Sequence, residues 1–355
     1  MSVAVASALD RIASVARTPT GAGRSYVPAS AFFPCPCRPL PRTVVPWTPD
    51  GLMRSRVRLV EVSALTPTQP RIILSAVRGY ARDLSSPMAG RLGESPLGTV
   101  GALPAVLPDG DALYVMDGHS RLAARIARGQ AVVAVQLAEA EETPPISPAL
   151  LARYVAGLDW YQGGQVGDIW IRAIRASTSE LPVLAESLAS RRVLDVGCNA
   201  GFFVREAARR GAEAWGIDAD QAAVEQALVL NEYLCSTARC VYVDVMRLSG
   251  WAESAQGFDD VLLMSVLHHL PRPNLALDQI AAITRGRLVI EALCWWEGCT
   301  ATPWHKLPDV AAVDGRRGFP TEACILAALS ERFKHARKIG QSAKQKDRQL
   351  FEATR

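Results

Sequence analysis

The sequence predicts an α/β fold for its C-terminal half, with a doubly wound and largely parallel sheet. From residue 193 onward, short apolar runs rich in β-branched residues alternate with longer stretches of helical periodicity. A turn of small residues follows the first run, and acidic residues end several of the runs. Because the carboxyl ends of parallel strands meet at one edge, we expect a Rossmann-like sheet with a ligand pocket at that edge.

The expected elements follow in order along the chain, each strand ending at a turn signal and each helix beginning just after one. Strands are predicted at 193–197, 213–217, 239–244, 258–264 and 287–292. Helices are predicted at 200–210, 220–235, 274–283 and 321–331.

The position of Asp195 indicates which ligand the pocket takes. In a dinucleotide fingerprint the turn after the first strand receives a pyrophosphate, and an acid there would repel it. Here Asp195 ends the strand, Gly197 and Gly201 flank the turn, and the lysine of a P-loop is missing. The pocket suits a ligand with an ammonium group, a sulfonium charge and a ribose whose hydroxyls face Asp218. S-Adenosylmethionine carries all of these groups.

Four motifs in order make the C-terminal half resemble the class I S-adenosylmethionine-dependent methyltransferases. They are Val193–Gly201, Gly216–Asp218, Val243–Val245 and Phe258–Leu270. Asn199 stands where many members of the family have glycine. The resemblance implies a seven-stranded sheet that ends in a strand pair, S-adenosylmethionine as cofactor, and methyl transfer (EC 2.1.1.-) to a small-molecule or nucleoside acceptor of unknown identity.

The resemblance also implies roles for the polar residues at the strand ends. Asp195 would orient the methionyl ammonium, Asp218 would accept from the ribose hydroxyls, and Asp244 would accept from the adenine amino group with Val245 beside the ring. The alternative is that Asp195 and Asp218 cap the helices that follow them. For Asp244 the alternative is that an aspartate is common in a loop after a strand. The full set of expected cofactor residues is Asp195, Gly197, Cys198, Asn199, Gly201, Phe202, Asp218, Ala219, Asp244, Val245 and Ser265.

His268 and His269 follow the fourth strand, where the methyl donor would face its acceptor. A histidine titrates near neutrality and suits a general base. The alternative is that the Leu-His-His motif has a structural role, as in other members of the family. Glu291, at the end of the next strand, is a competing candidate. Methyl transfer itself depends little on a general base, because in-line positioning of donor and acceptor accounts for much of the rate enhancement.

Aromatic residues are the candidates for the acceptor site. Trp160 and Tyr161 precede the first strand, whereas Trp295 and Trp296 lie in a long connection that also carries Arg316. Such connections often cover a binding site, and tryptophans suit an apolar or planar acceptor. The alternative is that these aromatics bury one another or pack against the sheet.

The N-terminal half shows a strand at 57–62, a strand at 112–116, a helix at 119–128 and a strand at 131–137. With Leu65–Arg71 and Asp117–Ala124, this unit resembles the ParB/sulfiredoxin-like domain, a small α+β fold. The resemblance implies that Gly118, His119 and Arg121 hold a nucleotide (CTP or ATP) or another anion at the helix N-terminus. Alternatively, Asp117 caps the helix and Arg121 packs on the surface.

These patterns divide the chain into four segments. Residues 1–52 hold eight of the 23 prolines and only two acids, which predicts disorder. An alternative is that translation begins at Met53. Residues 53–138 form the ParB/sulfiredoxin-like domain, the acidic and proline-containing stretch 139–149 is a linker, and 150–355 form the methyltransferase domain.

Composition bounds the location and partners of the protein. The formal net charge is +4 over 355 residues, which neither requires nor excludes a nucleic-acid partner. Without an apolar run of about 18 residues we expect no membrane span, and the scattered cysteines favour a reducing cytoplasm. No cysteine spacing suits a metal site, and the oligomeric state is left open.

Two other functions remain open from the sequence. The ParB-like domain could be the active part, as a nucleotide hydrolase or small-molecule kinase with the methyltransferase module as a ligand sensor. The chain could instead methylate tRNA. Met264–Leu267 replaces the Asp-Pro-Pro-Tyr type of motif that methylates base amino groups in DNA, which disfavours that substrate.

Overall fold

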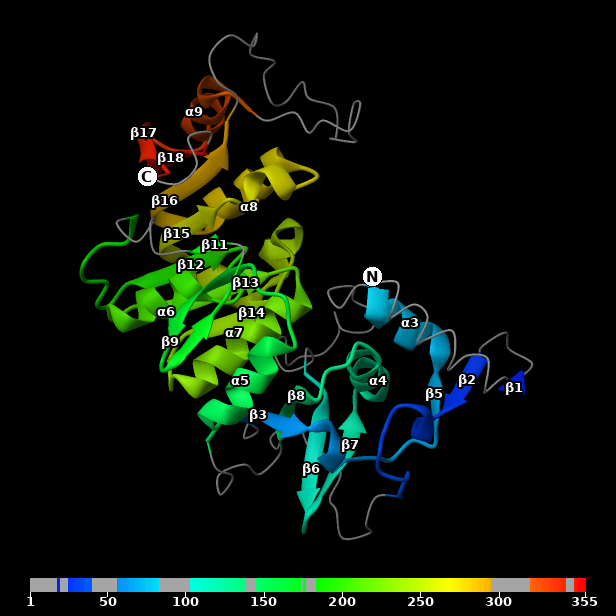
Figure 1. Ribbon diagram of the computed structural model, residues 1–355. Helices are drawn as coiled ribbons and strands as arrows, with labels where there is room; N and C mark the ends of the chain where they lie inside the picture. The colour runs from blue at the N-terminus through cyan, green and yellow to red at the C-terminus, as the bar shows by residue number, and fades with distance from the viewer. Residues whose placement is uncertain are drawn as a thin grey trace. The chain divides into compact units, whose positions relative to one another are not determined.

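The computed structural model describes residues 18–19, 25–39, 56–82, 103–137, 145–173, 175–176, 183–294, 320–342 and 348–355 (Figure 1). The chain forms two compact units. The first comprises Met1–Ile174 together with Asp220–Cys235, and the second comprises Arg175–Ala219 together with Ser236–Arg355.

The second unit is built on a seven-stranded sheet with the order β14-β13-β12-β15-β16-β18-β17. All neighbouring strands are parallel except β18, which runs antiparallel to both β16 and β17. This confirms the predicted Rossmann-like α/β sheet with its final strand pair. The strands are β12 (Arg192–Val196), β13 (Glu213–Asp218), β14 (Arg239–Tyr242), β15 (Phe258–Met264), β16 (Thr284–Leu293), β17 (His335–Gln341) and β18 (Arg348–Thr354). The short strand β11 (Arg175–Ala176) precedes them in the chain and is not part of this sheet.

The helices of this unit begin at the expected signals. Gly201 in a left-handed conformation precedes α6 (Phe202–Arg209), a proline opens α8 (Pro273–Ile283), and the Thr321 side chain caps α9 (Glu322–Ser330). Three short 3₁₀ segments are η6 (Val245–Gly250), η7 (Ala252–Gln256) and η8 (Leu267–His269). The central strands are buried almost without interruption, as expected of parallel strands covered on both faces.

The order of the strands places a pocket at a defined edge. Strand β12 lies between β13 on one side and β15 on the other. The order of the strands therefore reverses at β12: β13 and β14 extend the sheet to one side, and β15 and the later strands extend it to the other. Ligands of open α/β sheets bind at such a switch point, outside the carboxyl ends of the strands. The loops after β12, β13 and β15 are therefore where the site is expected.

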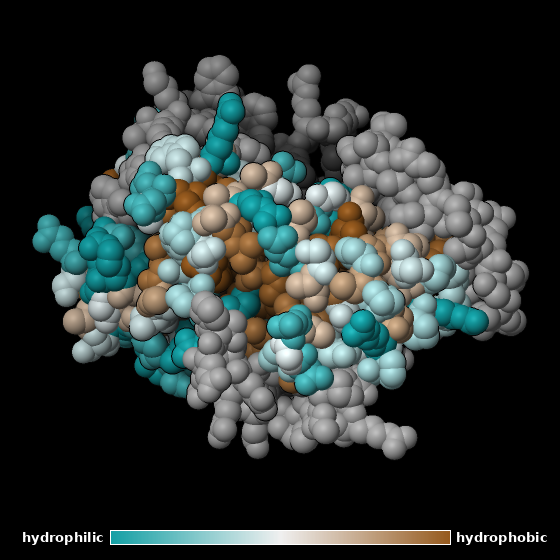
Figure 2. All heavy atoms as spheres, turned by 60° about the horizontal axis from the view of Figure 1, so that its bottom comes forward, coloured by the Kyte–Doolittle hydropathy of each residue, from teal (hydrophilic) through white to brown (hydrophobic). Residues whose placement is uncertain are grey.

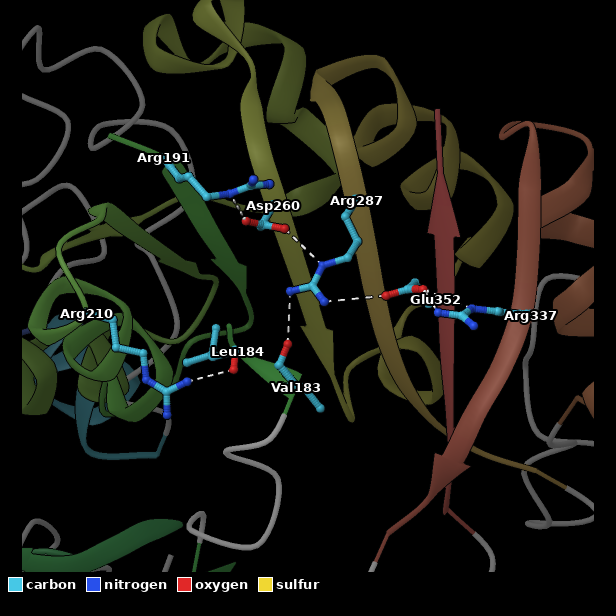
Figure 3. Close-up of polar contacts among 8 residues, drawn as sticks. All are labelled: Val183, Leu184, Arg191, Arg210, Asp260, Arg287, Arg337 and Glu352. Atoms are coloured by element: carbon cyan, nitrogen blue, oxygen red, sulfur yellow. Dashed lines mark hydrogen bonds and ion pairs between the residues drawn. The ribbon is translucent and has the colours of Figure 1, made fainter. Parts of the chain in front are cut away.

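A row of alternating charges joins the strands elsewhere in this sheet (Figure 3). The buried Asp260 carboxylate accepts from Arg191 Nε at 2.6 Å and from Arg287 Nε at 3.0 Å. Arg287 also approaches Glu352 at 3.4 Å, and Glu352 accepts from Arg337 at 2.7 Å. The row connects the start of β12 with β15, β16, β18 and β17.

The first unit contains a five-stranded mixed sheet with the order β3-β8-β6-β7-β4, and a small sheet β1-β2-β5. These strands are β1 (Thr18–Pro19), β2 (Ser25–Pro28), β3 (Arg56–Glu61), β4 (Leu65–Pro67), β5 (Arg71–Ile73), β6 (Ala105–Asp109), β7 (Ala112–Asp117) and β8 (Val132–Leu137). Short 3₁₀ segments are η1 (Ala29–Ala31) and η2 (Val62–Ala64). Helices α3 (Leu74–Arg82) and α4 (His119–Ala127) pack on each other, and both contribute to one apolar core.

The rest of the first unit follows that sheet in the chain and also includes a later helix. Helix α5 (Pro148–Ala156) is followed by a hairpin of β9 (Gln162–Val166) and β10 (Ile169–Ile171). Helix α7 (Gln221–Tyr233), which follows β13 in the chain, belongs to this unit and not to the unit of the strands that flank it. The predicted boundary at residue 150 thus differs from the observed division, because buried ion pairs join α7 to the N-terminal elements.

The prediction that residues 1–52 are disordered is wrong for residues 25–39. Strand β2 pairs with β5, and Val27, Phe32 and Phe33 are buried in the core of the first unit. The high proline content concealed these apolar side chains, whose burial offsets the loss of chain entropy on ordering.

The described surface mixes polar and apolar residues. On the face drawn in Figure 2, hydrophobic residues lie between hydrophilic ones. The large apolar side chains that are exposed in the described part are Tyr161, Trp170, Leu234 and Ile339. Within the same residues no helix is long and apolar enough to cross a membrane, and no cluster of three potential metal ligands occurs.

Candidate active site

The loop after β12 is held close to the neighbouring strand. The N–H groups of Gly197 and Cys198 both donate to the Ile217 carbonyl oxygen, at 2.8 and 2.9 Å. Gly197 and Gly201 have φ values of +75° and +77°, which favour glycine strongly. The two glycines therefore allow the chain to turn back at the strand end and expose its backbone there.

Gly197 is also required by a close neighbour. A Cβ at this position would lie 2.2 Å from Cγ2 of Val266, in the loop after β15. The loops that follow β12 and β15 thus meet at Gly197, and no larger residue fits between them without moving one of them.

We expect Gly197→Ala to lower the free energy of unfolding by about 3 kcal/mol, from left-handed strain plus the clash with Val266. Gly129→Ala is the matched control: its φ is +85°, but nothing lies within 4 Å of its Cβ position. That variant should lose only about 1 kcal/mol. Urea unfolding of both variants measures the difference, and equal losses would contradict the steric argument.

Asp195 is a buried acidic residue with an unusual environment. Its side chain is 1% exposed, and neither carboxylate oxygen has a hydrogen-bond partner among the residues that the structure describes. Burial, and secondarily the charge of Asp218, raise the pKa of Asp195 to about 8. A buried carboxylate without a donor is costly, so the residue is suited to a cationic ligand that supplies one.

Asp218 lies at the end of β13 and is partly exposed. Its Oδ2 accepts from the backbone N–H of Asn199 at 2.8 Å. Asn199 has a φ of +49°, and its buried side-chain oxygen has no partner within the described residues. The contact fixes the carboxylate of Asp218 against the loop after β12, with Ala219 exposed beside it.

The other expected cofactor residues differ in what their side chains do. Asp244 Oδ1 caps η6 by accepting from Met246 N at 2.9 Å, and Val245 is buried. The Cys198 side chain is fully buried, over the place where Gly216 has no side chain. Phe202 is half-buried and contacts Phe203 edge-on.

The three candidate bases occupy two different environments. His268 is half-buried and His269 exposed, with ring centroids 4.2 Å apart. Glu291 is fully buried, accepts from the Ser265 hydroxyl, and lies 3.6 Å from Arg348 Nη1.

Ser265 and Arg348 complete this buried group. Arg348 Nη1 donates to the Ser265 hydroxyl oxygen, and Ser265 has a left-handed φ of +63°. The cluster holds the loop after β15, so the geometry favours a structural role for Glu291. Arg348 was not predicted, because one arginine at the start of an amphipathic strand carries no sequence signal of its burial.

The expected acceptor residues are placed only in part. Trp160 is buried in the first unit, where its Nε1 donates to Val155 O at 3.1 Å and its ring meets Tyr154 edge-on. Tyr161 is exposed. Trp295, Trp296 and Arg316 lie outside the described residues. Trp160 thus packs against α5.

The expected anion site at the start of α4 has a mixed character. Gly118, with φ +84°, precedes the helix without a side-chain cap. Arg121 Nη2 pairs with Asp117 at 2.9 Å. His119 is buried, and its Nε2 accepts from the backbone N–H groups of Thr68 and Gln69. Burial lowers the pKa of His119 to about 4, so the ring is neutral at pH 7 and adds no charge for an anion.

Comparison with known proteins agrees with the geometry. Residues 169–302 match the model of a protein family described as a methyltransferase domain. The ubiquinone biosynthesis O-methyltransferase of Bordetella avium is 35% identical over 104 residues, which are 29% of this chain and 42% of that protein. That of Psychrobacter cryohalolentis is 38% identical over 93 residues, 26% of this chain and 35% of that protein. The chain spans less than half the length of these relatives.

Solved structures also align. Magnesium protoporphyrin IX methyltransferase from Synechocystis PCC 6803 with bound SAH aligns with 23% identity and a TM-score of 0.38, over 47% of this chain and 75% of that one. The N-terminal domain of EvdMO1 with SAH and D-fucose aligns with 17% identity and a TM-score of 0.44, over 57% and 95%. From the matched family model and the curated relatives, the chain contains a class I, S-adenosylmethionine-dependent methyltransferase domain in its C-terminal half.

Proposed function

We propose that this protein is an S-adenosylmethionine-dependent methyltransferase with a small-molecule acceptor. The observation that carries the proposal is the buried carboxylate of Asp195, which has no partner among the described residues and lies one residue before the end of β12, near Asp218. An ammonium group is the natural partner of such a carboxylate. Asp195 lies within residues 169–302, the segment that matches the methyltransferase family.

Each residue at the strand ends binds a different group of the cofactor. Asp195 binds the ammonium group, and Asp218, kept in place by the Asn199 N–H, accepts from the ribose hydroxyls. Asp244 retains one carboxylate oxygen beyond its capping bond for the adenine amino group. The bound cofactor supplies a methyl group that its sulfonium charge has already activated. The protein's task is then to orient donor and acceptor and to exclude water.

For proton removal from the acceptor we propose His268 or His269. Both lie on η8, which follows β15 and Ser265 in the chain. Glu291 is assigned to positioning, because its carboxylate is occupied by Ser265 and Arg348. A hydroxyl acceptor fits this arrangement, since O-methylation releases one proton.

The class of acceptor rests on the named relatives. They are ubiquinone biosynthesis O-methyltransferases, and the stretch that they share with this chain is shorter than half of their length. We therefore propose a small molecule with a nucleophilic hydroxyl, and leave tRNA as an outcome of the test. Purified protein with methyl-labelled S-adenosylmethionine is incubated with size-fractionated cell extract. Label in the small-molecule fraction supports the proposal, whereas label only in tRNA contradicts it.

Asp218→Asn is expected to weaken S-adenosylmethionine binding by about 10–100-fold, because a charged hydrogen-bond acceptor is lost while the shape is kept. Isothermal titration calorimetry measures the change. Asp278→Asn serves as the control, since Asp278 is an exposed acid on α8 that pairs with Arg332. An unchanged affinity in Asp218→Asn would remove the ribose assignment.

We also propose that the five-stranded N-terminal sheet is a ParB/sulfiredoxin-like module that binds a nucleotide at the start of α4. The support is the left-handed Gly118 before a helix N-terminus that no side chain caps, with Arg121 one turn away. Titration with CTP and with ATP tests this. Lack of heat with both nucleotides would show that the Asp117–Arg121 pair serves the fold alone.

A further inference from the structure

The first unit contains a cavity of about 410 Å³ whose lining residues belong to neither of the sites proposed above. It is lined by residues of η2, β4 and the β6–β7 hairpin (Figure 1), and by the segment 35–38. All of these elements belong to the first unit. A cavity of this size is at the lower end of the range that proteins use for small ligands.

The register of the strands explains why the lining residues share one face of the sheet. Thr66 of β4 pairs with Tyr114 of β7, and Asp109 of β6 pairs with Ala112 of β7. Paired residues of neighbouring strands point to the same side, and so do residues two apart on one strand. These four residues therefore lie on one side of the sheet. Val115 points to the other side and belongs to the apolar core of the unit.

The segment 35–38 is fixed beside the edge of the sheet and forms a wall of the cavity. Arg38 N donates to the Pro67 carbonyl oxygen of β4 at 3.0 Å, and Cys35 Sγ donates to the Ser63 carbonyl oxygen of η2 at 3.1 Å. Strand β4 is the last strand of the five-stranded sheet on this side. Both ends of the segment are thus held against the elements that form the rest of the cavity.

Two hydroxyl groups of the lining are buried and available to a ligand. Thr66 is 5% exposed and Tyr114 is 7% exposed, and both line the cavity. Neither hydroxyl forms a hydrogen bond with another residue in the described part of the chain. Buried hydroxyls nearly always have a partner, because an unmade hydrogen bond is costly. The pair therefore indicates that the cavity receives a polar molecule.

The charged residues of the lining are Arg38, Asp109 and Asp111. All three are exposed at the mouth of the cavity, and within the described residues none of them forms an ion pair. Two carboxylates and one guanidinium give the lining a net charge of −1. A molecule with amino groups, one carboxylate and a net positive charge complements this set.

The cavity is separate from the anion site at the start of α4. It takes its residues from the first half of β7, whereas α4 begins beyond the last residue of that strand. The ends of a six-residue strand are about 17 Å apart. A ligand in the cavity is therefore not held by the N-terminus of α4.

We propose that this cavity binds a basic amino acid or a molecule of the same chemistry. Asp109 and Asp111 bind its amino groups, and Arg38 binds its carboxylate. The hydroxyls of Thr66 and Tyr114 bond its polar atoms in the interior. The first unit then has a ligand-binding function of its own, which depends neither on S-adenosylmethionine nor on a nucleotide.

Calorimetric titration of the full-length protein with three probes tests the class of ligand. We expect L-lysine to bind with a Kd of about 1 mM or lower. Cadaverine keeps two amino groups and lacks the carboxylate, so it should bind about fivefold more weakly. L-Glutamate has the opposite net charge and should give no heat of binding. Absence of L-lysine binding, or cadaverine binding as tightly as L-lysine, would overturn the proposal.

A matched pair of variants tests the position of the site. Asp111→Asn should weaken L-lysine binding by about tenfold, because it removes a charged partner of the amino group. Asp168→Asn is the control: Asp168 is exposed and occupies the same place in the β9–β10 hairpin of this unit. Each aspartate follows a left-handed glycine, Gly110 with φ +57° and Gly167 with φ +55°. Equal effects of the two substitutions would place the binding elsewhere and refute the assignment.

Two further variants separate the contributions of the other groups. Tyr114→Phe removes only a hydroxyl and should weaken L-lysine binding by about fivefold, with urea unfolding as the check that the protein is folded. Arg38→Gln should lower the affinity for L-lysine to that for cadaverine and leave cadaverine binding unchanged. If Tyr114→Phe binds L-lysine like the wild type, or Arg38→Gln weakens both probes equally, the proposed arrangement is wrong.

Discussion

Asp195→Asn is expected to reduce S-adenosylmethionine affinity by about 100-fold or more and to make the unliganded protein more stable. The carboxylate is fully buried and lacks a partner within the described residues. Its desolvation therefore destabilises the folded protein until a cation binds. Asparagine keeps the shape and removes the charge. A charge-assisted hydrogen bond in a dry site contributes enough to account for the loss of binding.

The gain in stability should depend on pH. The unfolded chain releases the Asp195 proton near its ordinary pKa of 3.8, whereas the folded protein holds it until about pH 8. Between these values the folded state binds more protons than the unfolded state. The free energy of unfolding therefore falls as the pH rises through this interval, and above pH 8 the loss is complete. Asparagine lacks this loss, so its advantage should grow from pH 4 to pH 8 and reach on the order of 6 kcal/mol, because a pKa difference of one between the two states corresponds to about 1.4 kcal/mol.

Urea unfolding of wild type and Asp195→Asn at pH 5, 6, 7 and 8, without ligand, measures this advantage. Calorimetric titration at pH 8 measures the affinity. Asp278→Asn is the control for removing an acid from the same unit at an exposed position. A variant that binds S-adenosylmethionine like the wild type, or that is less stable at every pH, would contradict the assignment of Asp195.

Asp260→Ala is expected to lower the free energy of unfolding of the second unit by about 3 kcal/mol. The buried carboxylate bridges Arg191 and Arg287, and its removal ends the row of charges that joins five strands (Figure 3). Removal of one member of a buried ion pair is costly because its partner remains charged. Arg191 is 43% exposed and turns to water, which keeps the loss at the lower end of the range.

The far end of the same row supplies the control. Arg337 pairs with Glu352, but its side chain is 73% exposed, so Arg337→Ala should change the unfolding free energy by less than about 1 kcal/mol. Thermal unfolding compares the two variants, and a loss of about 3 kcal/mol corresponds to a fall in Tm of roughly 6–12 °C. S-Adenosylmethionine affinity should stay unchanged below the transition. Equal effects of the two substitutions would show that burial of Asp260 is unimportant.

Sequence alone determined the α/β sheet, five of its seven strands and the edge where the candidate site lies. It did so because apolar β-branched runs, turn glycines and acids at strand ends are local features with a fixed period. The strands β12 to β16 and the helices α6 to α9 lie where the periodicity placed them, within a few residues, whereas the final strand pair β17 and β18 was implied by the family resemblance. The positions of Asp195, Gly197 and Asp218 at strand ends follow from the same pattern.

Tertiary structure decided what each of these side chains contacts. Only the fold reveals that Asp195 has no partner in the described part, that Glu291 is held by Ser265 and Arg348, and that α7 is packed with the N-terminal unit. The arginine that holds Glu225 lies 100 residues earlier in the chain, and the one beside Glu291 lies on a different strand. The sequence does not indicate which distant residue pairs with a given charged side chain. Such pairing depends on how separate elements pack and not on local periodicity.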